Sequence, residues 1–75
     1  MHDIVALLEA RQVPHFESGQ PLQLHRGQIG TVVMTYDDGV CEIEFSGRDG
    51  RTYAMLAIDP AKLIILHDSP EQIAA

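Results

Sequence analysis

The segment spanning residues 27–53 reads GQIGTVVMTYDDGVCEIEFSGRDGRTY. Two Asp-Gly dipeptides, Asp38-Gly39 and Asp49-Gly50, interrupt its alternation of apolar and polar residues. Asp-Gly readily supplies the positive φ angles that tight hairpin turns require. The segment therefore predicts three antiparallel strands joined in sequence order by two tight turns.

The middle strand of this meander, residues 40–45, has the clearest alternation. Glu42 and Glu44 lie on one face, and Cys41, Ile43 and Phe45 lie on the other. An unpaired carboxylate is costly to bury, so the two glutamates must face water. We therefore expect Cys41, Ile43 and Phe45 in the core.

The turn lengths set the register of the outer two strands. A three-residue loop at 37–39 directs Val32, Met34 and Tyr36 outward, whereas a two-residue turn at 38–39 would reverse every assignment. We favour the longer loop, which pairs Thr35 with Cys41, Val33 with Ile43 and Thr31 with Phe45 on the core face. At the second turn we expect a two-residue Asp49-Gly50 loop. It pairs Phe45 with Ala54, Ile43 with Leu56 and Cys41 with Ile58, and it directs Tyr53 and Met55 outward.

The remaining segments complete a small all-β domain. Residues 3–8 are an apolar run that we interpret as a strand, with a helix over 2–12 as the alternative. Residues 9–26 show no sustained period and predict a long irregular loop. Asp59-Pro60 begins one helical turn, because Asp caps helices and Pro suits the first helical position. Residues 63–66 form the last strand, which closes against the first, and residues 69–75 form a partly disordered tail.

Composition narrows the function classes. The chain has 75 residues and a formal net charge of −6, which suits a single soluble domain and disfavours nucleic-acid binding. Its single cysteine excludes an internal disulfide and fits a cytoplasmic location. No apolar run reaches the ~18–20 residues of a membrane span, and we recognise no signal peptide.

This order of elements resembles that of an SH3-like barrel. Residues 26–33, RGQIGTVV, resemble the hairpin core of KOW-type domains. Across residues 3–66 the chain is similar to a bacterial family of small domains of unknown function, with matching motifs at residues 3–7, 26–33, 36–39, 42–45 and 49–52. The resemblance implies a small SH3-like five-stranded barrel over residues 1–68, with one helical turn before the last strand. Similar barrels in a ferredoxin-docking subunit of the photosynthetic NDH complex and in the nitrile hydratase β chain act as adaptors.

No residue pattern predicts catalysis, a cofactor or a metal site. The histidines lack the spacing of zinc ligands, although a chance site joining His15 and His25 is the alternative to solvated side chains; the four are His2, His15, His25 and His67. Cys41 is expected in the core rather than as a nucleophile. Turn chemistry explains the aspartates, which are Asp37, Asp38 and Asp49. Gly27-x-x-Gly30 lacks the Lys of a phosphate-binding loop. We therefore predict that the protein is not an enzyme.

The predicted outer face is the strongest candidate for a binding surface. It carries two methionines, two tyrosines and two glutamates: Met34, Tyr36, Glu42, Glu44, Tyr53 and Met55. Tyr and Met are enriched in recognition surfaces, which favours an exposed binding face. The alternative, weighed equally, is that the first loop or the tail covers this face. We predict a protein–protein interaction module. One hypothesis is self-association as a homodimer through this face, and another is an antitoxin- or immunity-like role. The alternative is KOW-like contact with RNA or the ribosome, for which the basic residues are Arg11, Arg26, Arg48, Arg51 and Lys62.

Overall fold

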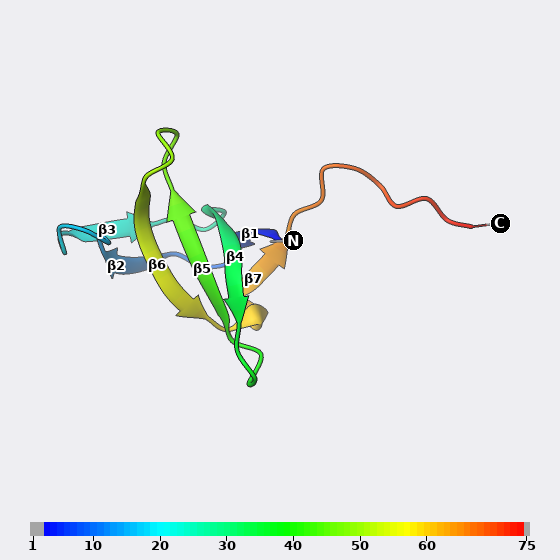
Figure 1. Ribbon diagram of the computed structural model, residues 1–75, viewed down its shortest axis with the longest axis horizontal. Coiled ribbons are helices and arrows are strands. Elements are labelled where there is room, and N and C mark those ends of the chain that lie inside the picture. Colours follow the sequence, from blue (N-terminus) through cyan, green and yellow to red (C-terminus); the bar gives the residue numbers. More distant parts are fainter. Residues whose placement is uncertain (1–2, 75) are drawn as a thin grey trace.

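The computed structural model describes residues 3–74 and consists of strands with one short 3-10 helix (Figure 1). The elements are β1 (Ile4–Leu7), β2 (Arg11–Pro14), β3 (Pro21–Leu24), β4 (Ile29–Thr35), β5 (Cys41–Ser46), β6 (Thr52–Ile58), η1 (Pro60–Lys62) and β7 (Leu63–Ile65). Five strands form one sheet in the order β6-β5-β4-β1-β7, and β2 pairs with β3 in a second sheet. The all-β class is therefore confirmed. Over residues 3–74 the two sheets do not close into a barrel.

The first third of the chain is more regular than the sequence predicts. Residues 4–7 form a strand, as expected, and not the alternative helix. The predicted irregular loop at 9–26 is wrong, because β2 and β3 form an antiparallel hairpin there. Pro14 lies opposite Pro21 at the tip end of that hairpin. Proline is tolerated at strand ends and edges, where its missing N–H breaks no internal ladder bond, so the two prolines conceal this hairpin.

Both Asp-Gly turns are three-residue loops with the same geometry. The backbone N–H of Tyr36 donates to the Val40 carbonyl across the first turn, and Gly47 donates to Arg51 across the second. The glycines have φ angles of 88° at Gly39 and 81° at Gly50, which other residues rarely adopt. The prediction for the first turn is confirmed. The two-residue loop predicted at the second turn is wrong.

A β-bulge in each outer strand of the meander resets the register. In β6 the bulge inserts Tyr53, so Phe45 still pairs with Ala54, and the error in turn length is cancelled. In β4 the register shifts between Val32 and Met34, so Val32 pairs with Ile43. Two adjacent valines provide no polar alternation that could reveal this shift.

The β4 bulge overturns part of the predicted core. Thr35 pairs with Cys41 as expected, but Thr31 pairs with Glu44 on the outer face, and Val32 instead of Val33 packs against the core. Gly30 is buried against Ile43 and Phe45. The inward positions predicted for β5 and β6 are confirmed: Ile43, Phe45, Ala54 and Ile58 are buried, and Cys41 and Leu56 pack against them.

The predicted helical turn and last strand are also confirmed. The Asp59 carboxylate accepts a hydrogen bond from the Ala61 N–H at 2.9 Å, which caps η1 at its N-terminus. β7 then pairs antiparallel with β1 at the edge of the sheet. The chain after β7 extends away from both sheets (Figure 1).

Candidate functional site

Five of the six predicted surface residues occupy the outer face of the meander. Met34 pairs with Glu42, and Glu44 pairs with Met55, so these four side chains share the face opposite the core. Met34, Tyr36 and Met55 are all exposed, and Met55 is the least exposed of the three. The glutamates lie on the middle strand. They separate Met34 from Met55, so this face has no continuous apolar surface across β4, β5 and β6.

Both glutamates on this face accept hydrogen bonds from neighbouring strands. The Tyr36 hydroxyl donates to Glu42 Oε1 at 2.9 Å, and the Thr52 hydroxyl donates to Glu44 Oε2 at 2.8 Å. The hydrogen bond to Glu42 raises the pKa of Tyr36 above its usual value, with smaller contributions from desolvation and from the Glu42 charge. Each carboxylate is thus fixed in position while it remains accessible to water.

Tyr53 does not share the outer face. The β6 bulge turns it toward the core, where its ring lies 6.3 Å from the ring of Phe45. Its hydroxyl accepts a hydrogen bond from Gln28 Nε2 at 2.9 Å. Tyr53 therefore connects β6 to the chain before β4. The predicted outward orientation fails because it assumed an unbroken register after the second turn.

A continuous apolar surface, which sequence reasoning missed, lies on the outer face of β1, β4 and β7. Ala6 pairs with Ile29 on one side and with Ile64 on the other. Three further apolar residues extend this surface along β1 and after β7. We call the exposed members the outer patch: Ile4, Leu8, Ile29, Ile64 and Leu66. They are 40–58% exposed and surround the buried Ala6. The sequence signal for this surface is the unbroken apolar runs at residues 4–8 and 63–66. Side chains alternate between the two faces of a strand, so such runs place apolar residues on both faces of the sheet.

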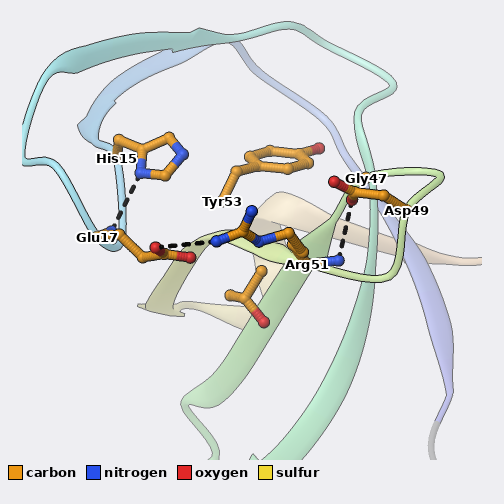
Figure 2. Close-up of a pocket in the computed structure, with 7 residues that line it drawn as sticks. His15, Glu17, Gly47, Asp49, Arg51 and Tyr53 are labelled. Carbon is orange, nitrogen blue, oxygen red and sulfur yellow. Dashed lines mark hydrogen bonds and ion pairs between the residues drawn. The ribbon is translucent and has the colours of Figure 1, made fainter.

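The pocket in Figure 2 lies where the tip of the β2–β3 hairpin meets the second Asp-Gly turn. His15 Nδ1 accepts the backbone N–H of Glu17 at 3.0 Å, and Arg51 contacts Glu17 at 3.4 Å. Asp49 accepts the backbone N–H of Arg51. Glu17, Asp49 and Arg51 interact with one another or with nearby backbone groups, and the Arg51–Glu17 contact links the hairpin to β6. Among these lining residues we find no acid and base placed as a catalytic pair.

The other candidate chemical groups lie apart. His25 lines a different pocket from His15, and Cys41 Sγ faces the Gly39 carbonyl at 3.6 Å. Over residues 3–74, no three His, Cys, Asp or Glu side chains gather as metal ligands would. His2 lies outside the described residues. In that same part of the chain no helix has the length and apolar character needed to cross a membrane.

Comparison with known proteins identifies the family and no activity. The chain matches no curated protein and no solved structure. Residues 1–65 match the model of a domain of unknown function, DUF4926. Because this match covers most of the chain, the protein belongs to the DUF4926 family.

Proposed function

We propose that this domain is a non-enzymatic protein–protein interaction module that binds a partner through the outer patch. The observation that carries the proposal is the pairing of Ile29 and Ile64 on either side of Ala6, which gathers exposed isoleucines on one sheet face. Scattered apolar residues are normal on a protein surface, but a contiguous patch with polar surroundings marks an interface. The patch spans three neighbouring strands, so it presents a rigid surface.

The charge beside the patch indicates what partner would fit. Glu44 pairs with Thr31, whose other neighbour is Ile4, so the acidic row of the meander borders the outer patch. The whole chain carries a formal net charge of −6. Complementary charge at the rim of an interface raises the association rate. A partner with an apolar centre and a basic rim would suit this surface, as would be expected for an antitoxin- or immunity-like role in the cytoplasm.

The arrangement of elements supports an SH3-like relationship as part of this proposal. The first and last strands pair, the first connection contains a hairpin, and a 3-10 turn precedes the last strand. The sequence resemblance implies the same order of the five main strands and the same helical turn, with a long loop where the hairpin lies. Fold alone does not specify function, so the relationship supports an adaptor role only together with the patch.

A matched pair of variants tests the proposal. Ile29→Glu places a charge in the outer patch at a side chain that is 58% exposed, so the fold should persist. Ile73→Glu makes the same change at a 90% exposed position in the tail. In pull-downs from host lysate, a protein captured by the native chain and by Ile73→Glu but lost with Ile29→Glu supports the proposal. Capture that is equal for all three chains, or by none, contradicts it.

A specific observation keeps RNA contact as a second candidate. Arg26 and Arg48 line one pocket together with His25 and Tyr53. Phosphate binding by such a cluster depends strongly on salt. A labelled RNA whose mobility shifts at low salt, and no longer shifts with an Arg26→Glu and Arg48→Glu chain, would favour this candidate. Absence of any shift at low salt would eliminate it.

A further inference from the structure

β7 is the last strand of the five-stranded sheet, and within residues 3–74 no strand pairs with its outer backbone edge. The Leu8 N–H donates to the Lys62 carbonyl, and the Leu66 N–H donates to the Ile4 carbonyl. Polar backbone groups alternate in direction along a strand, so residues 62, 64 and 66 face β1. The groups of Leu63, Ile65 and His67 therefore point away from the sheet.

The free groups along this edge form a specific pattern. The Leu63 N–H already donates to the Pro60 carbonyl and so is occupied by η1. Among residues 3–74, four backbone groups on three residues have no backbone partner along this edge: the Leu63 carbonyl, the N–H and carbonyl of Ile65, and the His67 N–H. Reading in the chain direction, these are an acceptor, a donor and acceptor on one residue, and a donor. An antiparallel copy of the same strand, centred on Ile65, presents the complementary order.

The side chains of this edge offer nothing that would prevent such pairing. Residues 63–66 are all Leu or Ile, and Ile64 and Ile65 are 50% and 49% exposed. Native edge strands are usually protected by charges, prolines, bulges or covering loops. Beside β7 lies an apolar pocket lined by Val5, Val32 and Ile65 among others. A short apolar edge beside an apolar pocket favours another apolar strand.

We propose that β7 pairs antiparallel with β7 of a second copy, about a two-fold axis at Ile65. The two Ile65 residues then exchange both backbone hydrogen bonds, and each His67 N–H donates to the Leu63 carbonyl of the other copy. Ile64 lies opposite Leu66 of the second copy on the outer face. The five-stranded sheets of the two copies join into one continuous sheet.

This register also pairs opposite charges at each end. Lys62 lies opposite Asp68 of the second copy, because residue numbers in facing pairs sum to twice that of Ile65. Lys62 contacts Glu9 at 3.0 Å in its own chain and is about half exposed, so it remains available to a second carboxylate. Shifting the axis to Ile64 or to Leu66 would lose this ion pair. The charges therefore select the axis at Ile65.

The paired edge is short, and we expect a weak dimer that forms with increasing concentration. Specific stable interfaces bury about 800 Å² on each partner, which is more than a five-residue strand pair provides. Ile29 lies on β4, on the far side of β1 from β7, and Leu8 lies beyond the end of β1. Pairing of two β7 strands therefore leaves both residues exposed. The dimer and the binding of a different protein can therefore succeed or fail separately.

A proline substitution tests the backbone pairing. Ile65→Pro removes an N–H that donates to no backbone group of the described residues, so the fold should persist. Ile65→Ala truncates the side chain and keeps that N–H. By sedimentation across the micromolar to millimolar range, we expect Ile65→Pro to raise the dimer dissociation constant on the order of a hundredfold, and Ile65→Ala to raise it much less. A native chain that stays monomeric throughout, or equal effects of the two variants, would overturn the proposal.

Charge reversal tests the register. Asp68→Lys places two cations opposite each other and should weaken the dimer on the order of tenfold, with a larger effect at low salt. Adding Lys62→Glu to the same chain restores opposite charges and should recover the native dissociation constant. Failure of the double variant to recover it would contradict the axis at Ile65. The amide protons of Ile65 and His67 should also exchange with solvent more slowly as protein concentration rises.

Discussion

The two edges of the five-stranded sheet differ in what covers them: the β2–β3 hairpin covers the β6 edge, and no other strand of the described residues pairs with the β7 edge. On the β6 edge, the tip of the β2–β3 hairpin docks through the Phe16 N–H, which donates to the Tyr53 carbonyl at 2.7 Å. A bulge at Tyr53 and the Arg51–Glu17 ion pair lie at the same place. On the β7 edge, residues 63–66 carry no charge, no proline and no bulge. In Figure 1 the hairpin lies beside β6, whereas β7 lies at the opposite side of the sheet.

The difference shows that covering an edge can be part of building the core. The hairpin contributes Val13 and Leu24 to the hydrophobic core, and Leu24 is only 2% exposed. β7 contributes the half-buried Leu63 to the same core, while Ile65 remains half exposed. One edge is therefore protected by a segment that the fold requires, and the other is left available for association.

The largest expected effect separates the two edges by their contribution to stability. Leu24→Ala leaves a cavity under the hairpin and should lower the free energy of unfolding by about 2–5 kcal/mol. Ile65→Ala removes a half-exposed side chain and should cost well under half of that. Urea unfolding of the two variants at a low protein concentration, where any dimer is dissociated, measures the difference. Equal losses in the free energy of unfolding would show that the β7 edge contributes as much to stability as the β6 edge that the hairpin covers.

The central strand should affect both edges together. A Cβ at Gly30 in β4 would lie 2.6 Å from Ile43 Cγ2 and 2.8 Å from Phe45 Cε1. Both neighbours are fully buried, so Gly30→Ala should cost about 1–3 kcal/mol through overpacking. Gly47→Ala is the control, because its nearest contact is the Asp49 carboxylate at 3.1 Å.

Hydrogen exchange shows whether the Gly30 effect reaches both edges. The Phe16 amide reports the β6 edge, and the Leu66 amide reports the β7 side, because each donates a backbone hydrogen bond. Gly30→Ala should accelerate exchange at both amides. Acceleration at Phe16 alone would mean that the hairpin opens independently of the sheet.

The sequence predicts the β7 side of this comparison better than the β6 side. Strong local signals, such as the Asp59-Pro60 turn and the alternation around Glu42 and Glu44, locate β5, β7 and the turn before it. The hairpin that covers β6 is held by Leu24 and by the Phe16 amide, which act across long separations in the chain. No local pattern encodes such contacts. The outer patch depends on the same kind of long-range pairing, since Ile29 and Ile64 flank Ala6 from two different strands. The apolar runs indicate that two faces carry apolar residues, but they do not indicate which of those residues lie together.

The ion pair at the covered edge should contribute little. Arg51 and Glu17 are 71% and 54% exposed, and their nearest atoms lie 3.4 Å apart. Exposed pairs are worth about 0.2–1 kcal/mol and weaken as salt screens them. Arg51→Ala should therefore reduce stability slightly at low salt and not measurably at high salt, in thermal unfolding. A loss that persists at high salt would mean that the Arg51 side chain holds the hairpin by packing.

The smallest effect is a titration that separates the two ways in which this chain could self-associate. The hydrogen bond to Glu42 raises the pKa of Tyr36, so this contact stabilises the fold fully below the ordinary tyrosine pKa and is lost as pH rises through the raised value. Glu42→Gln should lower the pKa, as measured by the ultraviolet absorbance of tyrosinate. Pairing at β7 leaves Tyr36 exposed, so its titration should not depend on protein concentration. If the pKa rises further with concentration, the copies meet through the Met34 and Tyr36 face that the sequence predicts, and the bare edge is not the interface.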